Sequence, residues 1–261
     1  MFEKIEESTL VYYRSDNITA RHLFSTRLGG VSTKPHLASM NVGENRGDSE
    51  ENVIQNITIL TRQIGCTPDE VIRSRQIHSA NVRAVHKNDA GAFFDDCDGF
   101  VTNERGICLT VKVADCVPIL LCDNEASVIG ALHAGWRGSA SGILGEGIKK
   151  MILLGAKASN IKIAIGASIR SCCYEVGKDF DTSVSESIAM SAQEKGMITK
   201  TPEGKYFADL VKLNTHFASI SGIPPENISV CQECTCCHPE LFFSHRYSKG
   251  HRGTMCAMIT L

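Results

Sequence analysis

Three stretches of the chain place apolar residues at helical spacing, and each has a recognisable start or stop. The first runs from Asp48 to Ile64 and opens with two glutamates, which suit the positive end of a helix dipole. The second has one apolar face from Ile143 to Ile152 and ends before Gly155. The third extends from about Phe207 to Ser219. These patterns predict three helices.

Shorter apolar runs, separated by polar breaks, predict β-strands elsewhere. Several such runs lie between Gly99 and His133, which favours adjacent strands over one long helix. The segment from Val71 to Val85 reads as strand, turn, strand, and a further strand covers Ile161 to Gly166. Pro118 is expected to limit central pairing in its strand, because proline donates no backbone hydrogen bond. Helices and strands thus share one chain that shows no internal repeat.

Size and charge exclude several classes of protein. At 261 residues the chain can bury a full core, and no low-complexity linker divides it, so we expect one domain over residues 1–261. The formal net charge of −2 offers no basic stripe for nucleic acid. No apolar run has the length of a membrane span, and the first residues are acidic where a secretory signal needs an apolar core. We therefore expect a cytoplasmic protein that binds neither nucleic acid nor membranes.

Three residues carry candidate metal-ligand chemistry: His78, Cys116 and His133. His78 lies near the predicted bend, Cys116 lies in a polar notch between two apolar runs, and His133 ends an apolar run ahead of Ala134 to Gly138. A thiolate and two neutral imidazoles satisfy a borderline-soft cation such as zinc and leave a fourth position open, which is typical of a catalytic site. A buried Asp115 would need partners, and orienting a ligand histidine is one way to find them.

A set of motifs follows in order along almost the whole chain. The most specific part is HAGWRG from His133 to Gly138, preceded by ADC and by QIH. Together the motifs resemble the YfiH family of laccase-domain proteins, once described as multicopper polyphenol oxidases and now regarded as purine nucleoside enzymes. The other motifs are STRLGGVS (Ser25 to Ser32), MNVGENRGD (Met40 to Asp48), DCDGFVT (Asp96 to Thr102), IGASIRSCCYEVG (Ile165 to Gly177) and CTCCHPELFFSHR (Cys234 to Arg246).

The resemblance implies both a fold and a site. The implied fold is a single α+β domain, in which two mixed β-sheets pack together and helices cover their outer faces as a four-layer α/β/β/α sandwich. The matching residues assign His78, Cys116 and His133 to the metal and catalytic site, in agreement with their ligand chemistry.

Five further residues are candidates for substrate binding. Because a guanidinium forks onto phosphate oxygens, Arg27, Arg137 and Arg246 are candidates for anion binding. Asn41 and Gln76 can hydrogen-bond a sugar or base, although amides in loops are as often turn formers.

The chain departs from the family pattern where the family tends to have two arginines. Tyr247 stands at one of these positions, and Gly253-Thr254-Met255 replaces a Gly-Arg-Met segment at the other. Arg170 and Arg252 lie nearby in the sequence and are candidates to substitute for them.

A second group of thiols lies in the segment from Cys231 to His238, which also contains Cys234, Cys236 and Cys237. These residues are enough in principle for a structural zinc site. However, adjacent cysteines point to opposite faces of an extended strand, and buried cysteine is often inert packing. The sequence therefore favours packing over a second metal site, and it indicates still less for Cys172-Cys173.

Four functions compete. The first is a zinc enzyme on purine nucleosides, which releases free base and ribose 1-phosphate from adenosine, inosine, guanosine or methylthioadenosine and also deaminates adenosine. The second is a copper-dependent polyphenol oxidase. A multicopper cluster needs many paired histidines, whereas this chain has nine histidines and no His-x-His pair. The third uses Cys116 as a nucleophile activated by His133. The fourth is a non-enzymatic, zinc-dependent scaffold. We expect the first, with zinc rather than copper as the metal and with purine nucleosides and phosphate as partners.

Overall fold

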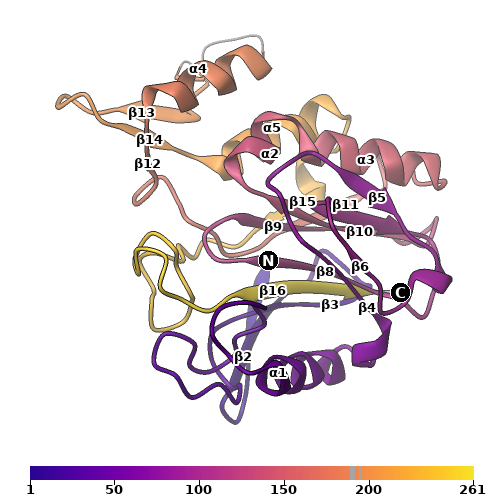
Figure 1. Ribbon diagram of the computed structural model, residues 1–261. Helices are drawn as coiled ribbons and strands as arrows, with labels where there is room; N and C mark the ends of the chain where they lie inside the picture. Colours follow the sequence, from indigo (N-terminus) through magenta and orange to yellow (C-terminus); the bar gives the residue numbers. More distant parts are fainter. Residues whose placement is uncertain (189–191, 194) are drawn as a thin grey trace.

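In the computed structural model, which describes residues 1–188, 192–193 and 195–261, two β-sheets pack face to face and helices cover both outer faces (Figure 1). The expected four-layer α+β sandwich is confirmed. The seven-stranded sheet has the order β1 (Phe2–Glu7), β2 (Leu10–Ser15), β3 (Arg21–Ser25), β16 (Met255–Thr260), β8 (Cys108–Val113), β4 (Val71–Ser74) and β6 (Phe93–Phe94). The six-stranded sheet has the order β15 (Ile228–Val230), β11 (Lys162–Ile165), β9 (Val117–Asp123), β10 (Val128–Ala134), β7 (Gly99–Thr102) and β5 (Val82–Ala84).

The helices lie on opposite sides of this pair of sheets. Helix α1 (Glu50–Gln63) covers the seven-stranded sheet, and α2 (Trp136–Ala140), α3 (Ile143–Leu153) and α5 (Leu210–Ile220) lie over the six-stranded sheet (Figure 1). Three apolar cores result: one under α1, one between the sheets, and one beneath α3 and α5. In the part of the chain that the structure describes, no helix is long and apolar enough to cross a membrane.

The helical patterns predicted two of the helices well and misplaced the start of the third. Helix α1 begins after Ser49, whose side chain accepts a hydrogen bond from the backbone N–H of Asn52. Helix α5 begins only after Asp209, because the residues before it form strand β14 (Tyr206–Ala208). The predicted helix start at Phe207 was therefore wrong, because Phe207 and Ala208 belong to a strand and the helix starts at Leu210.

That strand belongs to a small third sheet, which the sequence did not indicate. Its order is β12 (Glu175–Val176), β14 and β13 (Ile198–Lys200), and it projects from the sandwich beside α4 (Lys178–Ser187) (Figure 1). Strands of two or three residues are too short to show an alternating pattern. The remaining short elements are three 3₁₀ helices, Pro68–Glu70, Lys87–Asp89 and Pro225–Asn227.

Pro118 lies in a central strand, contrary to expectation. Strand β9 pairs with β10 on one side and β11 on the other, and Pro118 stands opposite His133 in the register. Pro118 is the second residue of its strand, and pairing with β11 ends one residue further on, at Ile119. Its carbonyl still accepts a hydrogen bond from the backbone N–H of Gly166, so the missing proline donor falls at the end of the ladder.

The chain crosses from the seven-stranded to the six-stranded sheet at three places that matter for function. The connections are β4 to β5, β6 to β7, and β8 to β9. His78 lies in the first connection, Asp98 in the second and Cys116 in the third. Residues far apart in the sequence therefore meet at one end of the sandwich.

Candidate active site

His78, Cys116 and His133 converge at this end of the sandwich. Each offers one ligand atom, and the three atoms lie within 4.8 Å of one another. Cys116 Sγ is 3.9 Å from His78 Nε2, and the two imidazole rings meet edge to face with their centroids 4.9 Å apart. His133 is buried, Cys116 is half-buried and His78 is exposed. One thiol and two imidazoles thus face a common point that solvent reaches from the side of His78.

Asp98 positions two of these three residues through hydrogen bonds. Its carboxylate is fully buried and accepts hydrogen bonds from the backbone N–H groups of Ile77, His78 and Ser79 and from the Ser79 hydroxyl. The other partner of the carboxylate is His133 Nδ1, at 2.8 Å from Asp98 Oδ1. This contact holds a proton on Nδ1, so Nε2 is the ring nitrogen that can bind a metal ion once its own proton is lost. A single acid therefore fixes the loop of one histidine and the tautomer of the other.

Asp115 does not orient a ligand histidine, so the role expected for it from the sequence is wrong. The Asp115 carboxylate accepts hydrogen bonds from the Thr235 hydroxyl at 2.6 Å and from the backbone N–H of Arg246 at 2.7 Å. It thereby ties the loop before β9 to the segment that precedes β16. A signal for Asp98 was present in the motif DCDGFVT, where an acid directly precedes a buried strand.

Backbone conformation brings the ligands close together. His78 and Asp115 both adopt positive φ, at 62° and 87°, which non-glycine residues rarely do. Gly135, the N-cap of α2, has no room for a side chain, since a Cβ there would lie 2.7 Å from His78 Cδ2 and 3.4 Å from Cys116 Sγ. The glycines of HAGWRG therefore serve the close approach of ligands that the sequence analysis expected.

The protonation of the group favours a thiolate. Burial raises the pKa of the Cys116 thiol, but the positive charge of His133 and hydrogen bonds from both histidines outweigh burial and lower it to about 6. Burial lowers the pKa of His133, but the Cys116 thiolate and the Asp98 carboxylate outweigh it and raise the pKa to about 9. A thiolate at neutral pH is the form in which cysteine binds metal ions.

A pocket of about 250 Å³ opens over the three ligands. Beside them its wall contains Arg252, which the sequence offered as a substitute for a missing arginine, and also Arg46 and Phe93, which the sequence did not single out. Phe93 is 48% exposed, so an aromatic face is available to a planar ligand. A larger groove of about 900 Å³ lies between β5, α3 and α5, but its walls include none of the three ligands, and we assign the site to the smaller pocket.

Arg252 has a hydrogen-bond donor available for an anion. Its Nη1 donates to the carbonyl of Gly253 and to the Thr254 hydroxyl, whereas its buried Nε has no hydrogen-bond partner in the part of the chain that the structure describes. Burial, followed by the nearby charge of Arg46, lowers the pKa of Arg252 to about 10, so the guanidinium stays charged at neutral pH. A buried donor without a partner is costly unless a ligand satisfies it.

Of the five residues expected to bind substrate, Gln76 alone lines this pocket. Its amide exchanges two hydrogen bonds of 2.7 Å with the backbone of Lys112. Asn41 is fully buried, and its side chain bonds Gly43, Asp48 and Thr254.

Arg27 lies outside the pocket and braces neighbouring loops. It donates to the carbonyls of Ala38 and Pro239, and its guanidinium lies over the Phe243 ring.

Arg137 and Arg246 are exposed and lie outside the walls of the 250 Å³ pocket. Arg246 donates to the carbonyls of Cys173 and Glu175 and covers the Tyr174 ring. The pKa of the Tyr174 hydroxyl is raised to about 12 by burial and then by the Cys116 thiolate, while both arginines act in the opposite direction. The two arginines therefore share the electrostatic surroundings of Tyr174 and Cys116.

Known proteins resemble this chain over most of its length. Residues 21–261 match the model of a family described as multi-copper polyphenol oxidoreductase laccase. A purine nucleoside phosphorylase YlmD of Geobacillus stearothermophilus is 34% identical over 90% of this chain and 88% of its own. An adenosine deaminase RL5 of an unknown prokaryotic organism is 32% identical over 85% and 87%, respectively. The crystal structure of a hypothetical protein YfiH of Bacillus licheniformis superposes with a TM-score of 0.91 at 29% identity, covering 100% of this chain and 98% of the other.

Proposed function

The chain belongs to the multi-copper polyphenol oxidoreductase laccase family, and from this premise we propose that it is a purine nucleoside phosphorylase. In the proposed reaction an oxygen of inorganic phosphate bonds to ribose C1′, the bond from C1′ to the purine nitrogen breaks, and free base and ribose 1-phosphate leave. The relatives that are named purine nucleoside phosphorylase support this substrate class. Adenosine and inosine are the expected substrates, with guanosine and methylthioadenosine as further candidates.

One observation carries this proposal: the pocket combines three metal ligands, an exposed aromatic ring and an arginine with an unsatisfied buried donor. A purine nucleoside offers a planar base and a sugar, and the second substrate is an anion. Phe93 supplies a face on which a base can stack. Arg252 and Arg46 supply positive charge for phosphate, and the free Nε of Arg252 gains a partner when phosphate binds.

The donor set fits zinc. One thiolate and two imidazoles form three protein ligands, which is the number typical of catalytic zinc sites. Zinc held there supplies Lewis acidity to the pocket. The chain itself prepares the site, because Asp98 orients His133 through Nδ1 and leaves Nε2 as the nitrogen that would bind the metal after losing its proton. We place zinc ahead of copper, since copper oxidases need additional histidine clusters, and the other candidate ligand group among the described residues consists of four cysteines.

We retain Arg137 and Arg246 as candidates for the sugar or phosphate. Both lie in the surroundings of Tyr174 and Cys116 rather than in the wall that contains Arg252. The substrate in this proposal lies over the ligands between these two positively charged regions. Arg27, Asn41 and Gln76 then position the loops around the pocket, as their backbone contacts indicate.

The same pocket is proposed to deaminate adenosine. In that reaction water adds to C6 of the purine and ammonia leaves, so phosphate takes no part. The relative named adenosine deaminase RL5 supports this second activity. We further propose that residues 1–261 act as one catalytic domain in the cytoplasm, where its twelve free cysteines stay reduced.

A second candidate function has one observation in its favour. Cys116, His133 and Asp98 are connected in the order found in cysteine hydrolases, with the thiol pKa lowered to about 6. Such an enzyme works without a metal. Removal of the metal by a chelator abolishes activity in our proposal and leaves it intact in the alternative.

Incubation of the purified protein with each nucleoside, with and without phosphate, tests the proposal. Chromatography should show free base and ribose 1-phosphate only when phosphate is present, and inosine from adenosine in both buffers. Equal base release without phosphate would identify a nucleoside hydrolase instead.

A further inference from the structure

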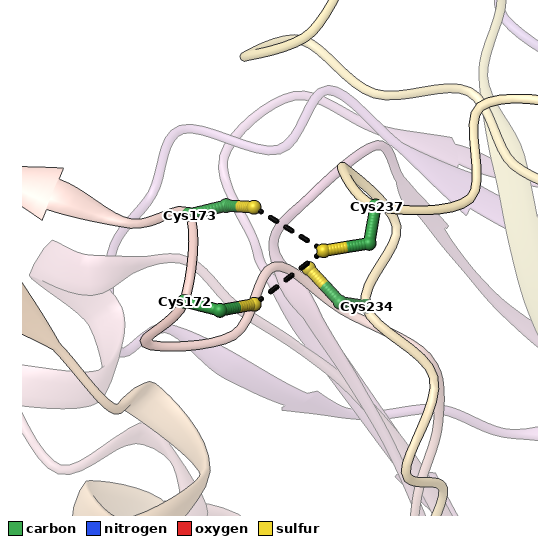
Figure 2. A group of neighbouring side chains, drawn as sticks. All are labelled: Cys172, Cys173, Cys234 and Cys237. Carbon is green, nitrogen blue, oxygen red and sulfur yellow. Dashed lines mark hydrogen bonds between the residues drawn. The ribbon is translucent and has the colours of Figure 1, made fainter.

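Four cysteines from two distant loops meet away from the active site. Cys172 and Cys173 lie in the turn after β11, and Cys234 and Cys237 lie in the turn after β15 (Figure 2). Their Sγ atoms lie within 4.8 Å of one another, and Cys237 Sγ is 3.6 Å from that of Cys172 and 3.4 Å from that of Cys173. The side chains point inward to a common centre (Figure 2).

This arrangement corrects the reading of the segment from Cys231 to His238. That segment supplies two thiols of the group rather than four, and Cys172-Cys173 supplies the others. Cys231 is instead buried in the core between the sheets, and His238 pairs with Glu233 and Glu240. Cys236 and Cys237 lie in a turn over residues 235–237, so the objection that adjacent cysteines point to opposite faces of an extended strand does not apply to them.

The spacing of the sulfur atoms suits a single metal ion. Four thiolates about 2.3 Å from a tetrahedral zinc ion lie roughly 3.8 Å from each other. The separations of 3.4 and 3.6 Å and the limit of 4.8 Å bracket this value. A disulfide would join only two of the four and would require sulfur atoms about 2.05 Å apart.

Backbone contacts hold the two loops together at this spacing. Ser168 and Cys234 form an isolated parallel bridge, and the backbone N–H of Thr235 donates to the Ser168 carbonyl at 3.1 Å. The backbone N–H of Arg170 donates to Cys234 Sγ at 3.4 Å. Donors aimed at a sulfur stabilise it as a thiolate, the form that binds metal.

Positive charge lies beside the group. The guanidinium of Arg170 donates to the Cys231 carbonyl at 3.1 Å, and that of Arg246 donates to the Cys173 carbonyl at 3.2 Å. Four thiolates and one divalent cation leave a net charge of −2, which two guanidinium groups offset. The exposure of Cys172 and Cys237 gives an ion access from solvent.

We propose that Cys172, Cys173, Cys234 and Cys237 bind one zinc ion as a closed structural site. Four protein ligands leave no position for a substrate, in contrast to the three ligands of the active site. The ion joins the turn after β11 to the turn after β15, directly before the small sheet begins at β12. It thereby holds the carbonyls to which Arg246 is bonded and stabilises the loop of Tyr174.

Metal content measured by inductively coupled plasma mass spectrometry tests this proposal independently of the enzymatic function. The proteins are wild type, Cys116→Ala, Cys237→Ser and Cys236→Ser, purified under reducing conditions from medium with zinc. Cys236 is the matched control, because it lies in the same turn but outside the group. We expect Cys116→Ala and Cys237→Ser each to lose one zinc ion per chain relative to wild type, and Cys236→Ser to lose none.

Cobalt gives a second readout that does not require Cys237→Ser to fold. Cobalt-loaded Cys116→Ala retains the four cysteines, and it should show the thiolate charge-transfer and visible bands of a tetrahedral site with four sulfur ligands. Absence of both zinc and these bands in Cys116→Ala overturns the proposal. A disulfide from Cys237 to Cys172 or Cys173 that persists in wild type purified under reducing conditions also overturns it. If Cys116→Ala keeps as much zinc as wild type, the structural site stands and the active-site metal fails.

Discussion

At the scale of single residues, the geometry of the candidate site depends most on a carboxylate outside the group of three ligands. Asp98 receives hydrogen bonds from the loop of His78 and from the ring of His133, and it is completely buried. Its charge both orients His133 and raises the pKa of that imidazole once the opposing effect of burial is overcome. The position of the proposed metal ligands thus depends on an acid outside the ligand set.

Replacing Asp98 with Asn tests this dependence. Asn keeps the shape of the side chain but loses its charge and one acceptor, so we expect zinc affinity and kcat/KM to fall by about ten- to a hundredfold. Competition with a chromophoric chelator measures the affinity. Asp96→Asn is the matched control, because Asp96 is exposed and pairs only loosely with Arg83. Equal zinc affinity in the two variants would show that Asp98 does not support metal binding.

A second prediction at this scale concerns Arg252. Loss of one charge-assisted contact to an anion costs on the order of 1.5 to 3 kcal/mol, or roughly ten- to a hundredfold in affinity. Arg252→Gln should raise the KM for phosphate by that factor and change adenosine deamination little. Arg137→Ala and Arg246→Ala, measured in parallel, show whether those arginines share the phosphate. If Arg252→Gln impairs both activities equally while zinc is retained, Arg252 positions the nucleoside instead.

At the scale of elements, the sequence predicted what depends on local periodicity and missed what depends on long-range contacts. Helices α1 and α3 follow from amphipathic spacing and end signals. Ligand chemistry within motifs singled out His78, Cys116 and His133, and the structure brings these three residues together. The strands of the small sheet are too short to show a period. The pairing of Cys172-Cys173 with Cys234 and Cys237 spans more than sixty residues and depends on the bridge at Ser168, which no local pattern reports.

The start of helix α2 provides the prediction at this scale. A Cβ on Gly135 would press on His78 and Cys116, so Gly135→Ala should push the ligands apart. We expect loss of zinc from the active site and of activity, with a cooperative thermal transition retained. Gly145→Ala is the control, because the added Cβ in helix α3 meets only Ser221 Oγ at 3.7 Å. That variant should match or slightly exceed wild type in stability, since Ala favours a helix by up to about 1 kcal/mol over Gly. Normal zinc content in Gly135→Ala would show that the site tolerates the clash.

At the scale of the whole molecule, the site exists because the chain passes repeatedly between two sheets. Three connections between them carry His78, Asp98 and Cys116, and β10 ends at the same place with His133. The core between the sheets fixes these connections relative to one another. The packed sheets therefore hold the candidate site residues on the connecting loops in place. The resemblance to the family indicated this architecture, whereas periodicity alone admitted other α/β arrangements.

The most direct test of the central claim is the phosphate-dependent release of base from inosine by Cys116→Ala, with zinc content determined on the same sample. Cys66→Ala, which removes an equally half-buried thiol near α1, serves as control. We predict that Cys116→Ala folds, lacks the active-site zinc and releases no base, while Cys66→Ala behaves as wild type. Wild-type release of base by a folded Cys116→Ala would contradict the assignment of His78, Cys116 and His133 as the catalytic metal site.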